Sequence, residues 1–552
     1  MLSSHIFKFT LAPDRNRENR HQLNLWRAAC VVFLLCVATA IVAPAQTFTL
    51  LATFEGANGD QPSSLVQGTD GNLYGTTYVG GDPCNNWAGC GTVFKLDPAA
   101  GITMLYSFTF PSDWPNGTYP AGPLVLATDG NFYGMTGTIG WQGTVFKIAP
   151  GETLTTLYTF CSLPNCYDGA APDAGLIQGS DGNFYGVTYR GGTGQQLCFM
   201  GGVGSGTCGV VFKITPTGKL TTLYSFCSQA NCTDGGGPSA ALVQATDGNF
   251  YGTTNLGGNG CYAYGCGGTL FKITPTGVLT TLHTFCAEPN CADGGGPSAA
   301  LVQATDGNLY GATGGGGAFG AGTLFKITPT GKLTTLYSFC AQSNCPDGTS
   351  PTGLFQATDG KFYGTAVMGG GAPDCPGYPT YSCGTAFNLD TGLPPFVSFV
   401  RSFGKVGYTV QILGQGFTGT TSVSFHGTPA TFTIKSDTSL TATVPAGAST
   451  GFVTVTTPSN TLKSNKIFRV KPQIFSISPT SGPVGTGVVI TGESLSRTQA
   501  VAVGWDYTFA SFTVDSDTQI TAIIPAGAVG GPITVFTSGG WEPSPTKFDV
   551  TP

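Results

Sequence analysis

Short apolar runs alternate with turn-forming residues along most of the chain. From residue 47 onward, runs rich in Val, Ile, Thr, Phe and Tyr are separated by Gly, Pro, Asp and Asn. In residues 241–254 two such runs flank an Asp-Gly pair, and in residues 268–285 two more flank a Pro and a Gly. These patterns predict two successive β-hairpins, so one unit of this kind predicts a four-stranded antiparallel meander.

The meander unit occurs six times, at spacings of 52 to 66 residues. One string, Asp-Gly-Asn/Lys-Leu/Phe-Tyr-Gly, begins at Asp70, Asp129, Asp181, Asp247, Asp306 and Asp359. Six meanders that cannot bury both faces alone favour closure into an all-β, six-bladed β-propeller over residues 46–392. The first strand, at 47–54, is of the fourth type and the last, at 384–389, is of the third type. We therefore expect the first strand to complete the last blade.

Successive connections of a meander alternate between the two ends of its sheet. The Asp-Gly-Asn and Thr-Pro-Thr-Gly turns should share one end of the propeller, and the long, variable loops should share the other. We interpret each repeated Asp as an acceptor for turn amides, because Asp-Gly is a hairpin signal, and the Tyr four positions later as a core residue. One carboxylate per turn is too few for calcium.

The cysteines form local pairs. Two of the 18 lie in residues 1–45, and the other sixteen predict disulfides typical of an exported protein. The pairs are Cys84 with Cys90, Cys161 with Cys166, Cys198 with Cys208, Cys227 with Cys232, Cys261 with Cys266, Cys286 with Cys291, Cys340 with Cys345, and Cys375 with Cys383. The alternative is metal ligation by thiolates, which needs four ligands at each site. Beyond residue 45 only His283 and His426 could add to the sulfurs, so we expect no metal and no cofactor.

The N-terminal segment has the features of an export signal. An Arg-bearing stretch precedes the apolar run 28–45, which ends in Ala43-Pro44-Ala45. This pattern predicts a signal peptide over residues 1–45, with cleavage before Gln46 and a secreted, extracellular or cell-surface product. The alternative is an uncleaved N-terminal anchor, since the run is almost long enough to span a bilayer. No later segment is apolar enough to do so, which predicts no membrane span after cleavage.

A second repeat begins after the last meander. Residues 432–447 match residues 512–527 at an offset of 80, and both lie among alternating strands and Gly/Pro turns. Units of this size predict two small immunoglobulin-like β-sandwiches, at 393–471 and 472–552.

Both repeats resemble known families. The strings Asp-Gly-Asn-Phe-Tyr-Gly-Thr-Thr, Gly-Thr-Leu-Phe-Lys-Ile-Thr-Pro-Thr-Gly and Leu-Thr-Thr-Leu-Tyr-Ser-Phe resemble the GloVer (Gloeobacter–Verrucomicrobia) repeat of exported bacterial proteins, over residues 47–392. That resemblance implies a propeller-like repeat and a surface or secreted location, and it implies no activity. Residues 474–486 and 488–492 resemble the IPT/TIG immunoglobulin-like family, whose bacterial modules usually act as spacers or binding appendages. Residues 396–404 lack the Ser-Pro-x-Ser-Gly opening, so the first sandwich is assigned through the internal match.

Charge and composition exclude several functions. The chain has 23 basic and 29 acidic residues, and 18 and 27 remain after residues 1–45, a net charge of −9. So few cations exclude nucleic acid and anionic membranes as partners. No motif makes His283 or His426 catalytic; His283 replaces a repeated Tyr, which predicts a packing role, and His426 predicts a strand or turn residue.

The variable loops carry the best candidates for a ligand site. Their aromatic residues could stack on sugars or on partner side chains: Trp87, Trp141, Tyr189, Phe199, Tyr262, Tyr264, Tyr378 and Tyr381. The hypothesis is a non-enzymatic binding protein with polysaccharide or a surface protein as partner. The alternatives are a structural envelope component and a polysaccharide-degrading enzyme, which would need two converging acids from among Asp82, Asp113, Asp173, Glu288 and Asp374.

Overall fold

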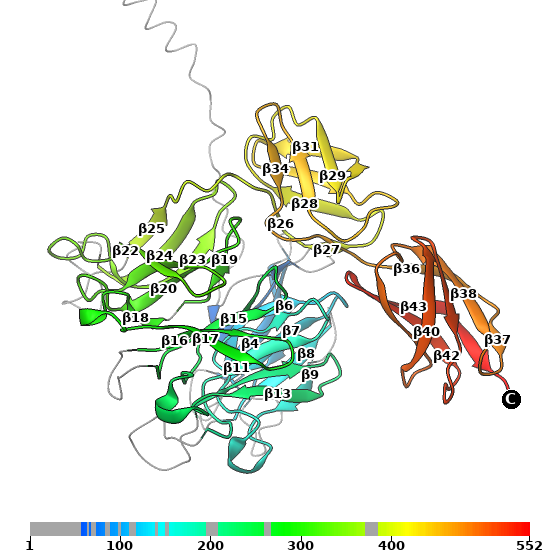
Figure 1. Cartoon of the computed structure of the whole chain (residues 1–552), viewed down its shortest axis with the longest axis horizontal. Coiled ribbons are helices and arrows are strands. Elements are labelled where there is room, and N and C mark those ends of the chain that lie inside the picture. Colours follow the sequence, from blue (N-terminus) through cyan, green and yellow to red (C-terminus); the bar gives the residue numbers. More distant parts are fainter. Residues whose placement is uncertain are drawn as a thin grey trace, which may run out of the picture. The chain divides into compact units, whose positions relative to one another are not determined.

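The chain folds entirely into β-structure with connecting loops and three short 3-10 turns, within the part that the structure describes (Figure 1). The computed structural model describes residues 57–62, 66–67, 73–82, 89–97, 101–109, 118–137, 142–149, 154–194, 208–258, 267–297, 299–369 and 385–552. The predicted signal peptide and the strand expected at 47–54 lie outside these residues. Among the described residues, no helix is long and apolar enough to cross a membrane.

Six antiparallel sheets correspond to the six repeats, and we number them repeat sheets 1 to 6. Sheets 1 to 3 contain β1 (Asp60–Pro62), β2 (Val66–Gln67), β3 (Leu73–Val79), β4 (Thr92–Asp97) and β5 (Gly101–Ser107); β6 (Pro120–Leu126), β7 (Phe132–Thr136), β8 (Thr144–Ile148) and β9 (Thr155–Thr159); and β10 (Ile177–Gln178), β11 (Phe184–Thr188), β12 (Val210–Ile214) and β13 (Leu220–Ser225). Sheets 4 to 6 contain β14 (Val243–Gln244), β15 (Phe250–Thr254), β16 (Thr269–Ile273) and β17 (Leu279–Thr284); β18 (Gly295–Pro297), β19 (Val302–Gln303), β20 (Leu309–Gly315), β21 (Thr323–Ile327) and β22 (Leu333–Ser338); and β23 (Thr349–Gln356), β24 (Phe362–Met368) and β25 (Thr385–Leu389).

Consecutive repeat sheets pack face to face through aromatic rings. The Tyr of one Asp-Gly-Asn-Phe-Tyr-Gly string stacks on the Phe of the next, as in Tyr133 on Phe184 and Tyr185 on Phe250, both at 3.9 Å between ring centroids. Strands β7, β11 and β15 are buried at every position because a further sheet covers each of their faces. The predicted all-β fold with propeller-type packing is confirmed.

A glycine makes this packing possible. Gly186 follows Tyr185, and a Cβ atom on it would lie 2.6 Å from Cζ of Phe212, far inside van der Waals contact. Because only hydrogen fits there, the Phe ring of the third strand can lie across the second strand. The same close approach of a Phe ring occurs at Gly134, Gly252, Gly311 and Gly364, which accounts for the Tyr-Gly pair in these repeats.

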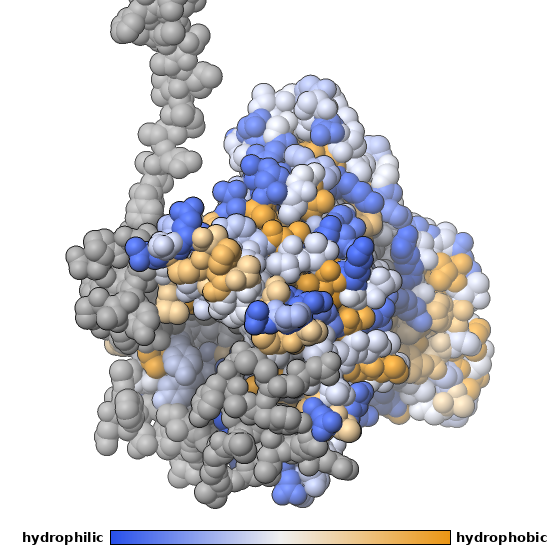
Figure 2. Space-filling view, turned by 60° about the vertical axis from the view of Figure 1, so that its left-hand side comes forward, coloured by the Kyte–Doolittle hydropathy of each residue, from blue (hydrophilic) through white to orange (hydrophobic). Residues whose placement is uncertain are grey.

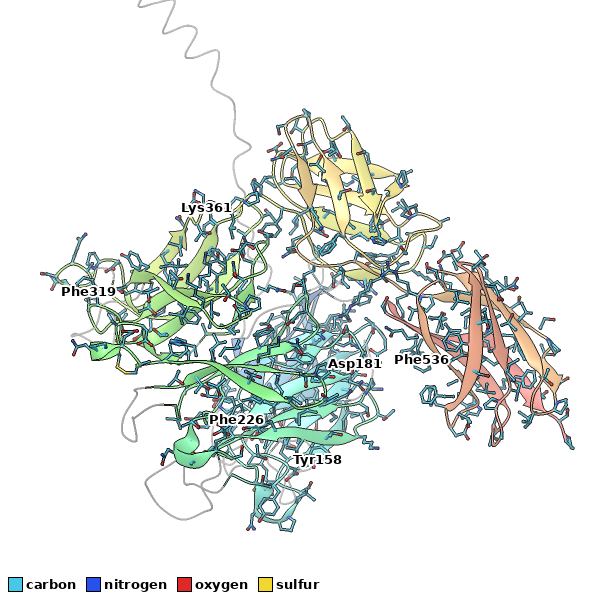
Figure 3. The ribbon with its side chains drawn as sticks, viewed as in Figure 1. Tyr158, Asp181, Phe226, Phe319, Lys361 and Phe536 are labelled. Carbon is cyan, nitrogen blue, oxygen red and sulfur yellow. A yellow bond between two sulfur atoms is a disulfide. The ribbon has the colours of Figure 1, made fainter. Side chains whose placement is uncertain are left out.

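The turn end of the propeller is built from hydrogen bonds around the repeated Asp. Asp181, labelled in Figure 3, accepts bonds from the Asn183 amide at 3.1 Å, the Tyr185 hydroxyl at 2.8 Å and the Lys213 ammonium at 2.8 Å. Turn-amide and Tyr-hydroxyl bonds recur at Asp129, Asp247, Asp306 and Asp359. These contacts confirm the structural role predicted for those Asp residues; Asp70 lies outside the described residues. The Lys213 contact also places the Thr-Pro-Thr-Gly turn at this end.

A glutamine at the end of the first strand ties each of sheets 3 to 6 to the sheet before it. Gln244 of sheet 4 accepts the Ser180 amide of sheet 3 at 2.8 Å, and its amide nitrogen donates to the Gly248 carbonyl of its own turn at 3.0 Å. Gln178, Gln303 and Gln356 make the same two bonds. We call these two bonds of each glutamine the glutamine latch. The sequence pattern did not predict it.

Two β-sandwiches follow the repeats. The first pairs the sheets β26-β28-β32-β31 and β30-β29-β33-β34 around a shared core, with a short parallel pair β27-β35. The second has the sheet order β36-β38-β41-β40-β39-β42-β43-β37, in which the long β40 takes part in both layers. Their strands are β26 (Ser398–Phe399), β27 (Phe403–Gly404), β28 (Thr409–Leu413), β29 (Ser422–Phe425), β30 (Thr428–Ala430), β31 (Phe432–Ser436), β32 (Ser439–Thr443), β33 (Val453–Thr456), β34 (Thr461–Lys463), β35 (Arg469–Val470), β36 (Gln473–Ser478), β37 (Ser481–Gly482), β38 (Gly487–Glu493), β39 (Thr498–Val503), β40 (Thr508–Ser516), β41 (Gln519–Ile523), β42 (Gly531–Thr537) and β43 (Gly540–Val550).

The surface shown in Figure 2 carries both hydrophobic and hydrophilic residues. On the face shown in Figure 2, hydrophobic residues are scattered among hydrophilic ones over the described part of the chain. Scattered apolar residues are normal on a protein surface. The hydropathy of this face therefore does not locate a binding site.

We expect Gln244→Ala to lower the free energy of unfolding by about 0.5–1.5 kcal/mol, because the bonds to the Ser180 amide and the Gly248 carbonyl are both lost. Gln244→Glu is the comparison variant, since it keeps an acceptor for the Ser180 amide but places a carboxylate against the Gly248 carbonyl, so we expect a loss in this variant as well. Urea unfolding followed by near-ultraviolet circular dichroism measures both variants. An alanine variant with the wild-type midpoint would show that the latch adds no stability.

We expect the Asp247 turn to make stability acid-sensitive. Burial alone would raise the pKa of Asp247, but bonds from Asn249, Tyr251 and Lys272 outweigh it and lower the pKa to about 2. Because an unfolded Asp titrates near pH ~4, this contribution is complete above about pH 4 and is lost as the pH falls towards 2. Unfolding midpoints measured from pH 5 to 2 should fall less steeply in Asp247→Asn than in wild type. Parallel curves would contradict the assignment.

Candidate functional site

The loop end of the propeller is braced by disulfides immediately after the fourth strands. The structure joins Cys161 to Cys166, Cys227 to Cys232, Cys286 to Cys291 and Cys340 to Cys345. Cys90 and Cys208 are also disulfide-bonded. The remaining cysteines predicted to pair lie outside the described residues: Cys84, Cys198, Cys261, Cys266, Cys375 and Cys383.

The Cys208 sulfur lies within 4.8 Å of those of Cys227 and Cys232. This is the kind of convergence that thiolate metal ligation requires. Because all three sulfurs are in disulfides here, they are not thiolate ligands.

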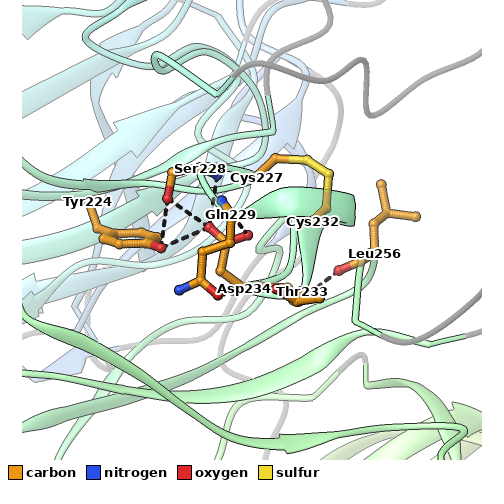
Figure 4. Close-up of a disulfide and its surroundings, with 9 residues drawn as sticks. Tyr224, Cys227, Ser228, Gln229, Cys232, Thr233, Asp234 and Leu256 are labelled. Atoms are coloured by element: carbon orange, nitrogen blue, oxygen red, sulfur yellow. Dashed lines mark hydrogen bonds between the residues drawn. A yellow bond between two sulfur atoms is a disulfide. The ribbon is translucent and has the colours of Figure 1, made fainter.

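A carboxylate anchors each of these disulfide segments, and three of the four are buried: Asp168, Asp234 and Asp293. Asp234 is fully buried, and its Oδ2 accepts bonds from the Tyr224 hydroxyl at 2.8 Å and from the Ser228 amide and hydroxyl at 2.9 and 3.0 Å (Figure 4). Burial, with the bond to Asp234, raises the pKa of Tyr224 to about 12, so this phenol stays protonated as a donor. We call this set of contacts the bracket; it fixes the disulfide segment to the outer strand β13.

The bracket recurs in the three other disulfide segments. Tyr158, labelled in Figure 3, donates to Asp168 at 2.8 Å, and Tyr337 donates to Asp347 at 2.9 Å. His283 takes the Tyr position in the fourth, with Nε2 3.0 Å from Oδ2 of Asp293. His283 is therefore a packed substitute for Tyr, as predicted.

Sequence reasoning missed the bracket carboxylates. Each lies two residues after the second Cys of its pair and is followed by Gly, in all four segments. This Cys-x-Asp-Gly pattern was the available signal. A carboxylate repeated with a disulfide indicates a structural role, and the contacts agree.

An open cavity of about 430 Å³ lies beside the His283 bracket, lined by His283, Glu288, Ala292, Asp293, Leu333 and Thr335. Asp293 is only 5% exposed, and its oxygens face His283 and the amides of Ala287 and Glu288. Among the lining side chains, Glu288 alone offers a carboxylate that is exposed to solvent. A glycosidase needs two such groups, roughly 5–10 Å apart.

The other acids considered for catalysis come from separate loops. Asp82 follows β3 and Asp173 precedes β10, and both are exposed. Asp113 and Asp374 lie outside the described residues. His426 is in the turn between β29 and β30, where its Nδ1 lies 2.8 Å from the Ser449 hydroxyl.

Of the predicted ligand-contacting aromatic residues, the structure describes Tyr189. It follows β11 at the loop end and is half-buried, with its ring close to the backbone of Gly237. Burial raises the pKa of Tyr189, consistent with a ring held against the protein. The other seven lie outside the described residues: Trp87, Trp141, Phe199, Tyr262, Tyr264, Tyr378 and Tyr381.

The loop end has further exposed aromatic residues that sequence reasoning missed. Tyr78 is 51% exposed and lies 5.1 Å from Tyr119 between ring centroids. Tyr167, in the Cys161–Cys166 segment, is 43% exposed, and Phe319, in the loop between β20 and β21, is 53% exposed (Figure 3). Tyr78 could have been found from the sequence, because it lies four residues after the repeated Tyr of its repeat, as Tyr189 does in its own.

We expect Asp234→Asn to lower the free energy of unfolding by about 2 kcal/mol, because a buried charged acceptor of several bonds is lost. The Cys227–Cys232 disulfide should also be reduced faster by dithiothreitol. His283→Tyr restores the side chain of the other brackets and serves as the control, with a change within about 1 kcal/mol. Thermal unfolding and timed thiol labelling measure both effects; equal behaviour of the two variants would contradict the bracket.

Comparisons with solved structures give only distant likenesses. A luciferin-regenerating enzyme is 13% identical, with 61% of this chain and 94% of its own covered and a TM-score of 0.35. The aldose sugar dehydrogenase of Streptomyces coelicolor is 14% identical, with 62% and 98% covered and a TM-score of 0.33. A surface glycan-binding protein of Prevotella bryantii is 20% identical, with 29% and 40% covered and a TM-score of 0.21. At such TM-scores these likenesses assign no function.

Family models give a clear assignment. No curated protein matches the sequence. The Gloeobacter/Verrucomicrobia repeat model matches residues 38–200 and 199–387, more than half of the chain, and the IPT/TIG domain model matches residues 394–468 and 472–550. The chain therefore belongs to the Gloeobacter/Verrucomicrobia repeat family and carries two IPT/TIG domains after its repeats.

Proposed function

We propose that this chain is an exported, non-enzymatic binding protein whose propeller binds a polysaccharide at its loop end. The observation that carries the proposal is the chemistry of that end. Its buried carboxylates are held in brackets, whereas several of its aromatic rings face solvent. Aromatic rings present large, rigid contact surfaces at little entropic cost, and loops on rigid scaffolds often carry binding sites.

The Tyr78–Tyr119 pair is the most developed part of this surface. The two rings lie 5.1 Å apart with 36° between their planes, so they form a joint platform. Burial, and then the neighbouring Tyr78, raise the pKa of Tyr119, so its hydroxyl remains a hydrogen-bond donor at neutral pH. A sugar ring has apolar C–H faces and a polar rim, and such a platform offers partners for both.

Export is part of the proposal. Four disulfides within short loops are typical of chains that fold in an oxidising compartment. The N-terminal signal pattern points the same way. On this proposal residues 46–392 form the binding propeller, and the sandwiches at 393–471 and 472–552 extend from it at the cell surface or outside the cell.

The enzymatic alternative has less support. A glycosidase needs two carboxylates that come together, but among the side chains lining the cavity beside His283 only Glu288 offers a carboxylate exposed to solvent. The carboxylates that recur there are the bracket residues, each of which is hydrogen-bonded to the Tyr or His side chain of its own repeat.

We expect Tyr78→Ala combined with Phe319→Ala to weaken polysaccharide binding at least fivefold, because two exposed stacking surfaces are removed. Phe355→Ala is the matched control: Phe355 is 58% exposed but lies beside the Asp359 turn, at the opposite end of its sheet. Affinity electrophoresis of the chain lacking residues 1–45, in gels containing neutral polysaccharides, measures retardation.

Sugars released into the same samples are assayed in parallel. Retardation that is lost in the double variant and kept in Phe355→Ala, with no sugar released, supports the proposal. Released sugar would establish the enzymatic alternative. Retardation that persists in the double variant would move the site away from these residues.

A further inference from the structure

The second sandwich has a cluster of exposed aromatic side chains on one sheet. Trp505 and Phe509 are 68% and 67% exposed, and Tyr507 and Trp541 are 44% and 37% exposed. Phe536, labelled in Figure 3, lies between them, with its ring centroid 6.1 Å from that of Tyr507 and 6.4 Å from that of Phe509. We call these five residues the aromatic face.

Strand register places Phe509, Phe536 and Trp541 of the aromatic face on the outer side of the sheet. Phe509 lies opposite Ala502 on β39, and Ala502 lies opposite Thr534 on β42. Ala502 and Thr534 alternate along their strands with residues of the sandwich core, which are Val501, Val503, Ile533 and Val535. Side chains of a strand alternate between faces, so Ala502 and Thr534 point outward. Phe536 is two residues beyond Thr534 and pairs with Trp541, so both share this outer side.

The rings cover the outer side of the sheet. Ala502 is 0% exposed and Thr534 is 1% exposed, although both point away from the core. Phe509 lies directly opposite Ala502, and Phe536 is two residues beyond Thr534 on the same side, so a large ring stands beside each small residue. The outer side therefore has a floor of small residues beneath projecting rings.

The first sandwich provides an internal comparison. Its hairpin β29–β30 corresponds to β39–β40, because Phe425 pairs with Thr428 and with Val453 as Val503 pairs with Thr508 and with Ile533. At the positions of Phe509, Phe536 and Trp541 the first sandwich has Pro429, Thr456 and Thr461.

The small residues beneath these positions also differ. Ser424 and Thr454, in the places of Ala502 and Thr534, are half-buried and share a hydrogen bond of 2.7 Å. The hairpin turn also differs in length. It has two residues, 426–427, in the first sandwich and four, 504–507, in the second, and the longer turn supplies Trp505 and Tyr507. The fold thus forms with a polar outer side, so it does not require the aromatic face.

We propose that the aromatic face of the second sandwich binds a neutral polysaccharide chain. Ring faces carry negative partial charge and are attracted to the weakly positive C–H face of a pyranose. An open sheet with several rings can contact successive sugar units of a linear chain.

Charge favours a neutral polymer over an acidic one. Lys547 lies 5.6 Å from the Trp505 ring centroid, where a cation–π contact engages it, and Asp506 accepts a bond from Thr508 in the same turn. One cation and one carboxylate leave this end of the face without net charge, and the whole chain carries −6. An acidic polymer would be repelled by the chain and would find little to neutralise it.

This site does not depend on the loop-end site. It lies on another part of the chain and is argued from other residues, so either proposal can fail alone. If both hold, the chain binds polysaccharide at two places, which raises the overall affinity wherever one polymer can reach both.

The test replaces the aromatic face with the residues of the first sandwich. Phe509→Pro, Phe536→Thr and Trp541→Thr are combined in the chain lacking residues 1–45, and Trp541→Thr alone is made in case the triple variant does not fold. Phe475→Thr is the control, since Phe475 is 55% exposed and lies on β36, in the other layer of the same sandwich. Circular dichroism and thermal unfolding establish that each variant is folded.

Affinity electrophoresis uses hydroxyethyl cellulose, galactomannan and arabinoxylan as neutral probes and polygalacturonate as the acidic probe. We expect at least a tenfold loss of affinity for a neutral probe in the triple variant, at least a threefold loss in Trp541→Thr, and wild-type affinity in Phe475→Thr. Tyr78→Ala with Phe319→Ala is run beside them, so that loss from the propeller site is seen separately.

Three results would overturn the proposal. They are wild-type retardation of the triple variant, retardation of the wild-type chain by polygalacturonate alone, and no retardation by any probe. Sedimentation velocity adds a fourth: a wild-type dimer that becomes monomeric in the triple variant, with unchanged polysaccharide affinity, would assign the face to self-association.

Discussion

The stacking of a tyrosine from one repeat sheet on a phenylalanine of the next is the contact on which the propeller depends. At Tyr185 and Phe250 the ring centroids are 3.9 Å apart, while the Tyr185 hydroxyl donates to Asp181 of its own turn. One side chain therefore joins neighbouring sheets through its face and a β-turn through its hydroxyl. Such aromatic pairs add about 0.5–1.5 kcal/mol each beyond the burial of their area. Repetition makes the sum large.

The turn end and the loop end of the propeller differ in how their residues are held in place. At the turn end, the Asp bonds and the glutamine latch use most of the polar groups, which leaves a uniform surface. At the loop end, the bracket fixes only the base of each disulfide segment, at residues such as Asp234 and Ser228. Loop residues such as Tyr78, Tyr167 and Phe319 lie outside the bracket and are exposed. The loop end can therefore differ from blade to blade, and it displays side chains such as Tyr78 and Phe319.

The sequence predicted those features of the fold that recur in every repeat. The strands, the turns, the packed tyrosines and the exchange of Tyr for His283 all follow from strings that recur six times or from one departure within them. The bracket was missed although Cys-x-Asp-Gly recurs. The role of an Asp in a loop depends on which hydrogen-bond donors surround its carboxylate, and the sequence does not show them. The latch by Gln244 was missed because its partner, Ser180, is 64 positions away in another repeat. The exposure of a single side chain such as Tyr78 depends on which residues lie next to it in space, and a repeated sequence motif does not show these neighbours.

Comparison of the two sandwiches shows which aromatic residues the fold requires and which it does not, a distinction that the sequence alone did not allow. Aromatic residues in strands are common, because β-structure favours them, so Phe509 and Phe536 look unremarkable in the sequence. The register shows that their positions face outward and that the sister domain fills them with Pro429 and Thr456. Both cores are complete without the outward rings. The same fold forms elsewhere in the chain with Pro or Thr at these positions, so the exposed rings are not required for folding, and the proposed binding role gives them a function.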